Sequence, residues 1–220
     1  NAPTVYNAAY NFVQFWDGRA ADLKEQAAGP PLNPVEMGHK SFDDICAVLA
    51  EDKEFTKTFS EVYPDGFSQS NITEAIAEFE KTLLTPSRFD QYLRGDKSAL
   101  TAEEQEGYAL FKANKCATCH VGMNIGGQSY DYMGIKNSYF DYRGTGLTDG
   151  DNGRYAVTKQ ESDLHKFKTP TLRNVMITYP YMHDGSINNI EDAVRIMHEF
   201  QIGTTCLLYT SPSPRDTERS

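Results

Sequence analysis

The sequence has 220 residues, of which 21 are Lys or Arg and 31 are Asp or Glu, so its formal net charge is −10. This length allows one large domain or two domains of about 100 residues, and the acidic balance argues against nucleic acid as a partner. The negative charge favours a partner with a basic docking face or simply keeps the protein in solution. The sequence contains no run of about 18 apolar residues, the length that a membrane span requires, so no membrane span is predicted.

Neither end of the chain carries a folding pattern. The sequence opens within a polar stretch, Asn1-Ala2-Pro3-Thr4, without an initiating Met, so we expect the natural N-terminus and any export signal to lie upstream. After Gly203 the helical periodicity stops. Residues 206–220 are therefore interpreted as a non-native or disordered tail.

Three segments combine a capping pair with apolar residues at helical spacing. In each pair a small polar residue is followed three positions later by an acid, as helix starts favour. The pairs are Ser41 with Asp44, Asn71 with Glu74, and Thr101 with Glu104. The third predicted helix runs directly into residues 116–120.

Residues 116–120 read Cys-Ala-Thr-Cys-His and form the most specific pattern of the chain. Two thiols three positions apart, followed by His, are the attachment pattern of a c-type haem. Each sulfur forms a thioether with a vinyl group, and the imidazole binds the iron. A thioredoxin-like dithiol would need a βαβ context, and a zinc site would need a second Cys/His pair. We therefore predict one haem c on Cys116, Cys119 and His120.

The region from Gly122 to about Lys168 is rich in Gly, Tyr, Asp and Asn and has little periodicity. It predicts a long loop of the kind that wraps a cofactor. Residues 149–153 resemble the start of an EF-hand, but the loop lacks the glycine at its sixth position and the closing glutamate. A final helix is expected to begin near Asn189.

Residue types alone do not identify the side chain that would bind the iron opposite His120. A thioether in place of a second imidazole would raise the iron potential. On an apolar helical face, Met197 is more typical of a core residue than of a ligand. The candidates are His39, His165, His183, His198, Met123, Met133, Met176, Met182 and Met197.

No segment sustains a period of two, so the fold class is predicted to be mainly α. The polar, turn-prone stretch around Arg88 to Lys97 is the best domain boundary. We divide the chain into residues 1–92, residues 93–205 and the tail 206–220.

Seven segments, in this order and spacing, resemble the bacterial di-haem cytochrome c peroxidases. Each is weak alone, and together they span nearly everything from Asn1 to Gly203. The segments are NAPT at 1–4, QFWDGR at 14–19, NPVEMG at 33–38, the CxxCH at 116–120, GRY at 153–155, KTPTLRNV at 168–175 and HDGS at 183–186.

The resemblance implies two cytochrome c-like domains, each with one covalent haem c. Residues 1–92 would be the incomplete remainder of an N-terminal domain that binds the peroxide-splitting haem, whose CxxCH would precede Asn1. Residues 93–205 would be the C-terminal electron-transfer domain. Its high-potential haem would have His120 and Met197 as axial ligands. This chain would then carry one of two expected haems and be inactive alone.

The resemblance also implies roles for residues outside the CxxCH. Glu36 matches the family's acid/base residue, which would move a proton between the two peroxide oxygens. Gln26 matches the amide that positions peroxide or water, and Trp16 matches the residue between the two haems. By residue type alone, Glu36 is a solvated loop acid, Gln26 an exposed helix residue and Trp16 a buried aromatic anchor.

A calcium ion is implied at the domain interface. Its ligands would be the side-chain oxygen of Asn1 and the backbone carbonyls of Thr178 and Pro180, with water completing the shell. The resemblance further implies a periplasmic homodimer that reduces hydrogen peroxide to water with electrons from a small cytochrome c or cupredoxin.

Two other functions remain alternatives. A related di-haem enzyme oxidises a tryptophan of a partner protein and has tyrosine where Met197 stands; Tyr179 and Tyr181 are nearby. A plain electron-transfer cytochrome c without peroxide chemistry is the second alternative. Peroxide consumption with a reduced cytochrome donor separates it from a peroxidase.

Overall fold

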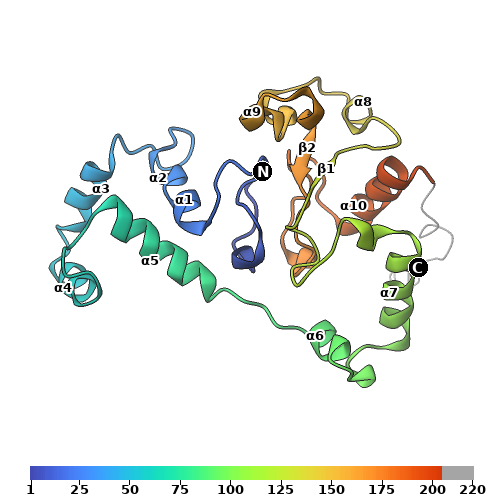
Figure 1. Cartoon of the computed structure of the whole chain (residues 1–220), viewed down its shortest axis with the longest axis horizontal. Coiled ribbons are helices and arrows are strands. Elements are labelled where there is room, and N and C mark those ends of the chain that lie inside the picture. The colour runs from blue at the N-terminus through green and yellow to red at the C-terminus, as the bar shows by residue number, and fades with distance from the viewer. Residues whose placement is uncertain (205–220) are drawn as a thin grey trace, which may run out of the picture.

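The computed structural model describes residues 1–204, so the predicted tail at 206–220 lies outside the described residues. Short helices dominate these residues, as the sequence predicts (Figure 1). The helices of the first half are α1 (Leu23–Ala27), α2 (Gly29–Leu32), α3 (Phe42–Leu49), α4 (Lys53–Val62) and α5 (Gln69–Lys81). Those of the second half are α6 (Arg88–Leu93), α7 (Ala102–Ala113), α8 (Tyr139–Arg143), α9 (Tyr155–Thr158) and α10 (Ile190–Ile196).

Local capping chemistry sets several of these helix starts. The Ser41 hydroxyl accepts a hydrogen bond from the backbone of Asp44, 3.1 Å away, and Thr101 and Glu104 form a reciprocal capping box. Asn189 caps α10 in the same way. These three predicted starts are confirmed, because a cap depends only on residues that are close in sequence.

The predicted cap at Asn71 is wrong by three residues. Helix α5 begins at Gln69, and the hydroxyl of Ser68 caps it by accepting from the Asn71 backbone at 3.2 Å. The Asn71 side chain instead donates to Asp65 and to the carbonyl of Gly66. Serine is as good a cap as asparagine, so the first available cap along the chain starts the helix.

Two hydrophobic clusters hold the first half together. Phe42, Phe59 and Ile72 are buried where α3, α4 and α5 meet. Ala8, Leu23 and Ala77 form a smaller cluster between the N-terminal segment, α1 and α5. Helix α5 therefore serves as the common wall of this half, and the chain leaves its end towards α6 (Figure 1).

The first twenty residues lie against the second half of the molecule. The Phe12 backbone donates to the carbonyl of Gly127, 2.9 Å away. The guanidinium of Arg154 donates to the carbonyls of Asp17 and Gly18 at 3.0 and 2.9 Å. In Figure 1 the N-terminus lies beside the two strands. The segment assigned to domain 1–92 thus contacts both halves, and the boundary at residue 93 stays a prediction.

The region predicted as one long loop contains short regular elements. Strands β1 (Tyr130–Tyr132) and β2 (Lys166–Lys168) pair antiparallel, with Tyr130 opposite Lys168. Three residues are too few to show a period of two in the sequence, which explains why the strands were not predicted. Helix α8 packs its buried Tyr139 against Ile196 and Phe200 beside α10.

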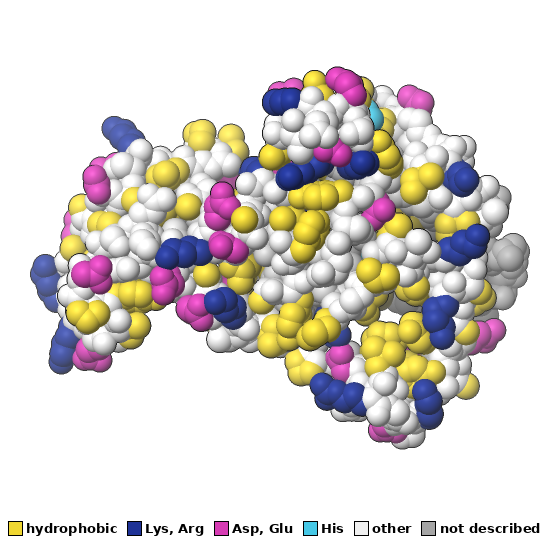
Figure 2. Space-filling view, in the orientation of Figure 1, with side chains coloured by type: hydrophobic (Ala, Val, Ile, Leu, Met, Phe, Trp, Pro, Cys, Tyr) yellow, Lys and Arg dark blue, Asp and Glu magenta, His cyan; other side chains and the backbone are white. Residues whose placement is uncertain are grey.

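Hydrophobic side chains gather on the surface around α6 and α7 (Figure 2). There the rings of Phe89 and Tyr92 both meet the ring of Tyr108 edge-on, with centroids 5.0 and 6.2 Å apart. Within residues 1–204, none of the helices has the length and apolar character of a membrane span.

Candidate functional site

The predicted haem-attachment residues follow directly after α7. Lys115 turns the backbone with a positive φ of 62°, and Cys116–Thr118 form one turn of 3₁₀ helix. Both thiols, Cys116 and Cys119, are free and half-buried. One turn therefore places the two sulfurs and His120 in succession, as the double thioether attachment requires.

The imidazole of His120 is held by the backbone that follows it. Its Nδ1 lies 3.2 Å from the carbonyl oxygen of Ile125. A carbonyl can only accept, so Nδ1 carries the proton and Nε2 keeps its lone pair. Burial lowers the pKa of His120 below its ordinary value, although the backbone of Ile125 and Pro170 opposes this effect. The side chain is therefore a neutral imidazole with Nε2 able to bind a metal.

The two thiols are protonated at neutral pH. Burial raises the pKa of Cys119 to about 11, and the nearby carboxylate of Asp131 adds to this effect. Burial also raises the pKa of Cys116. The Asp131 carboxylate is fixed in turn by the hydroxyls of Ser129 and Thr169. Free thiols and a neutral imidazole are the donor set that a c-type haem needs, so these residues fit the group.

Met197 stands where α10 gives way to a π-helix, Met197–Ile202. It is half-buried beside the cluster around Tyr139. The next residue, His198, has its Nε2 3.2 Å from the side-chain oxygen of Asn114. Because Asn114 lies two residues before Cys116, this contact ties the Met197 segment to the thiol segment. π-helical turns are frequent at functional sites.

The other ligand candidates differ in their surroundings. Met182 is a core residue with 7% exposure, whereas Met123 and Met176 are more than half exposed. Two histidine candidates, His165 and His183, use a ring nitrogen to contact Asp151. None of these observations decides the sixth ligand, which stays a prediction.

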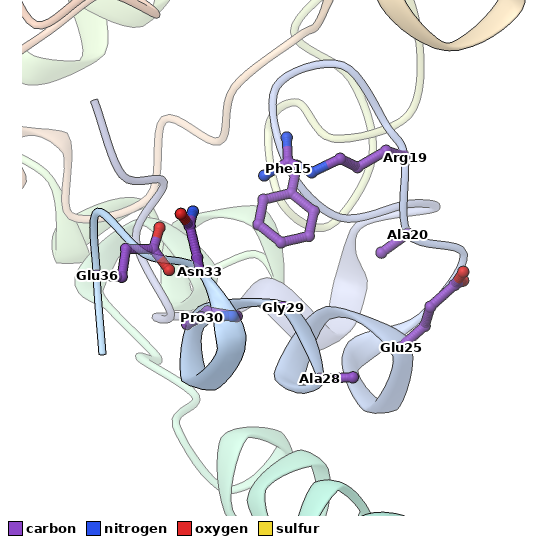
Figure 3. A pocket seen from close by; sticks show the side chains of 9 residues that line it. All are labelled: Phe15, Arg19, Ala20, Glu25, Ala28, Gly29, Pro30, Asn33 and Glu36. Atoms are coloured by element: carbon purple, nitrogen blue, oxygen red, sulfur yellow. The ribbon is translucent and has the colours of Figure 1, made fainter. Parts of the chain in front are cut away.

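Glu36 lines a cavity of about 330 Å³ in the first half (Figure 3). Glu36 and Asn33 share one end of this cavity, and the ring of Phe15 forms its wall. The Arg19 guanidinium lies 3.5 Å from the centroid of the Phe15 ring. Gln26 is half-buried on α1 and is not among the residues that line the cavity. The structure thus places Glu36 at the cavity and Gln26 outside its lining.

Trp16 lies at a second cavity, of about 570 Å³, between the N-terminal segment and the second half. Its indole nitrogen donates to the Asn1 carbonyl at 2.8 Å, and its own carbonyl accepts from the backbone of Lys168 at 2.8 Å. Arg19 lines both cavities. The predicted acid/base residue and the single tryptophan are therefore on neighbouring cavities that share one cationic side chain.

The residues predicted for calcium come partly together. The Asn1 side-chain amide lies 2.9 Å from the carbonyl oxygen of Pro180 and 2.8 Å from that of Met182. Turning the amide over would present its oxygen at the same position. Thr178 lies two residues before Pro180. Oxygen donors of this kind suit calcium.

A buried charged cluster beside the second cavity was not predicted. Arg143 donates twice to Asp151, at 2.7 and 2.8 Å, and once to Asp184 at 2.9 Å. The Nε2 atom of His183 lies 2.7 Å from Asp151. The side chains of Arg143 and Asp151 are 8% and 1% exposed. The sequence signals this cluster only through the HDGS segment, because Asp184 lies 41 residues from Arg143 and His183 lies 32 residues from Asp151.

Comparisons with known proteins show which sequences and folds this chain resembles. Residues 1–98 fit the family model described as di-haem cytochrome c peroxidase. Cytochrome c peroxidase Ccp of Escherichia coli is 54% identical over 92% of this chain and 43% of its own length. Cytochrome c551 peroxidase of Nitrosomonas europaea is 47% identical over 92% and 59%, respectively. The chain thus spans about half the length of these curated relatives.

More distant matches include the methylamine utilization protein MauG of Methylophilus methylotrophus, 32% identical over 88% of this chain and 56% of its own. Among solved structures, a MauG-like protein associated with microbial copper homeostasis superposes with a TM-score of 0.78 and 27% identity. The match covers 90% of this chain and 62% of that one. The diheme peroxidase BthA of Burkholderia thailandensis shares the fold, with a TM-score of 0.65, 24% identity, and coverage of 83% and 50%.

Proposed function

The chain belongs to the di-haem cytochrome c peroxidase family, and from this premise we propose that the protein carrying it reduces hydrogen peroxide to water. The identity of 54% and 47% to two named peroxidases, each over 92% of this chain, is the observation that carries the proposal. The reaction takes two electrons and two protons for each peroxide and yields two waters. A small cytochrome c or cupredoxin would supply the electrons.

We further propose that Cys116 and Cys119 would hold a haem c through thioethers, and that His120 and Met197 would bind its iron. When bound, this group supplies reversible one-electron chemistry. The chain's own contribution is to hold it: the Ile125 carbonyl orients the imidazole, and the contact of His198 with Asn114 keeps the Met197 segment nearby.

The proton chemistry is assigned to the cavity at Glu36. Splitting the O–O bond requires that a proton moves from one peroxide oxygen to the other, and a carboxylate at the cavity can accept and return it. Gln26 would orient peroxide or water. The cavity supports the assignment of Glu36, since it leaves that carboxylate open to a small molecule.

The remaining assignments extend the same proposal. Trp16 would carry electrons between the two haems, and Asn1, Thr178 and Pro180 would bind calcium. The sequence contains one CxxCH and the family is di-haem, so the second haem would be held by residues outside this sequence. Residues 1–92 would complete that haem's domain and residues 93–205 would form the electron-transfer domain of a periplasmic homodimer.

The acid/base role is tested by Glu36→Gln in the haem-loaded protein expressed from its natural gene. We expect kcat for peroxide to fall at least about 100-fold, as loss of a general acid/base implies, with unchanged haem absorbance. The matched control is Glu61→Gln, which neutralises an exposed carboxylate on α4. Equal turnover in both variants would remove Glu36 from the mechanism.

Oxidation of a partner's tryptophan is the less favoured function. The MauG relatives are 30–32% identical to this chain, against 43–54% for three relatives named as peroxidases. Consumption of one peroxide for every two donor molecules oxidised, with no partner protein present, supports the peroxidase. Reduction of the haem by the donor, one electron for each haem and without peroxide consumption, would support plain electron transfer.

A further inference from the structure

Lys168, the last residue of β2, is a buried cation that lacks a counter-ion among residues 1–204. It is 4% exposed, and no side-chain hydrogen bond or ion pair of its ammonium group occurs within this part of the chain. Burial alone lowers its pKa to about 8. Lysine is almost never buried without a partner, and an isolated charge in a protein interior is costly. The ammonium group therefore has room for an anionic partner that residues 1–204 do not supply.

The carboxylates around the strand pair are already committed. Asp131 on β1 binds the hydroxyls of Ser129 and Thr169. Asp163 accepts from Thr158 at 2.9 Å and pairs with Lys166 at 3.3 Å. The residue directly opposite Lys168 is Tyr130, which carries no charge at neutral pH because burial raises its pKa.

The backbone next to Lys168 leads directly to the haem-binding histidine. Thr169 binds Asp131, whose charge is felt by both Cys119 and His120. The backbone of Pro170, the next residue, faces the imidazole of His120. The backbone amide of Lys168 itself donates to the carbonyl of Trp16. The backbone of Lys168 thus connects Thr169 and Pro170, beside the predicted haem ligand, with Trp16 at the second cavity.

A haem attached here brings its own carboxylates. The porphyrin carries two propionates on the edge opposite the vinyl groups that the thiols capture, and they are its only ionised substituents. We propose that the Lys168 ammonium binds one propionate of the haem held by Cys116, Cys119 and His120. The inference rests on the proposed haem site and not on peroxide chemistry.

Two consequences follow for the bound group. A paired ammonium keeps the propionate ionised to lower pH, since an opposite charge favours the charged form. The positive charge also favours ferrous over ferric iron, because the reduced centre carries one positive charge fewer. Arg154, Asp17 and Asp163 act on Tyr130, the residue opposite Lys168, and Asp131 acts on His120; these charges stay unchanged when Lys168 is replaced.

The contact is tested directly by solid-state NMR on the haem-loaded 220-residue chain. The haem propionate carboxyls carry ¹³C, lysine side chains carry ¹⁵Nζ, and the dipolar coupling between them is measured. We expect one carboxyl carbon within about 4 Å of a lysine nitrogen, the reach of an ion pair. The coupling should vanish in Lys168→Arg, which keeps the charge but carries no ¹⁵N label, and persist in Lys57→Met, a surface control.

Lys168→Met provides the second measurement. The proton affinity of that propionate should rise at least tenfold, as the loss of a close opposite charge implies. The ferrous-to-ferric ratio at fixed potential should fall about tenfold, a shift of about 59 mV. Lys168→Arg should stay within about threefold of the unchanged chain.

An absent ¹³C–¹⁵N coupling in the unchanged chain overturns the inference even if every variant fails to fold. A coupling that survives in Lys168→Arg also overturns it, because another lysine then makes the contact. A chain that stays colourless after expression with the haem-attachment machinery contradicts the haem site itself. These results separate a failure of the inference from a failure of the proposed function.

Discussion

At the scale of single residues, one hydrogen bond prepares His120 for its predicted role. The carbonyl of Ile125 fixes the proton on Nδ1, so that Nε2 keeps its lone pair and is able to bind iron. Gly126 makes the turn behind it possible, because its φ is 139° and a Cβ there would lie 2.0 Å from the Pro170 carbonyl. The same loop therefore positions the ligand and brings Pro170 against it.

Replacing Met197 tests which side chain completes the iron's coordination. Met197→His exchanges a thioether for an imidazole, which favours ferric iron. We expect the midpoint potential of the haem-loaded chain to fall by about 0.1–0.3 V, well within the roughly 0.8 V that axial ligands span. Potentiometric titration measures it.

The control for this experiment is Met176→His. Met176 is 60% exposed and should leave the potential within about 0.03 V of the unchanged chain. A fall in the control, with none in Met197→His, would make Met176 the ligand instead.

At the scale of elements, a bidentate ion pair joins α6 to the segment that follows β2. Arg173 donates to both oxygens of Asp90, at 2.6 and 3.0 Å. The side chains are 12% and 19% exposed. This bidentate pair lowers the pKa of Asp90 well below its ordinary value. Such geometry is stronger than that of ordinary surface pairs.

Asp90→Asn should therefore destabilise the chain in a pH-dependent way. We expect a loss of about 1–3 kcal/mol in the free energy of unfolding at pH 7, typical of hydrogen bonds to charged groups. Because the folded-state pKa is depressed, the stability is fully present above the unfolded pKa of about 3.9 and is lost as pH falls towards the folded value. Urea unfolding at pH 7 and at pH 3 measures the difference.

Glu106→Gln, on the exposed side of α7, is the control for Asp90→Asn. It should change stability by less than about 0.5 kcal/mol at either pH. A loss in Asp90→Asn that stays constant from pH 7 to pH 3 would contradict the role of the Arg173 pair.

Sequence reasoning succeeded where the determinants are local. The cap at Ser41 and the capping box at Thr101 depend on residues three positions apart, and the CxxCH is contiguous. The sequence did not predict strands β1 and β2, because each has only three residues. The sequence does not predict the burial of Lys168 either, because that burial arises from packing between segments that are more than a hundred residues apart.

At the scale of the whole molecule, the N-terminal segment joins the two halves. Ala8 and Leu23 pack against α5 in the first half, whereas Phe12 and Trp16 bind the second half through their backbones. The two cavities lie on either side of Arg19 within this segment. The relative position of Glu36 and the CxxCH therefore depends on contacts made by the first twenty residues.

Replacing Arg154 tests the contact between the N-terminal segment and the second half. Its guanidinium donates to the carbonyls of Asp17 and Gly18 and lies 4.8 Å from the centroid of the Tyr130 ring. Arg154→Met keeps much of the apolar stem but removes both hydrogen bonds. Losing about 1–2 kcal/mol of local stability should speed hydrogen exchange of the Lys168 amide, which donates to Trp16, roughly 5- to 30-fold.

The internal reference for this experiment is hydrogen exchange of the Ile72 amide, which lies inside α5 of the first half. It should exchange at the same rate in Arg154→Met as in the unchanged chain, because its hydrogen bond lies in another hydrophobic cluster. Arg94→Met, which removes an exposed cation after α6, should leave both amides unchanged. If Lys168 and Ile72 instead accelerate together, Arg154 stabilises the chain globally, and the junction does not open as a separate unit.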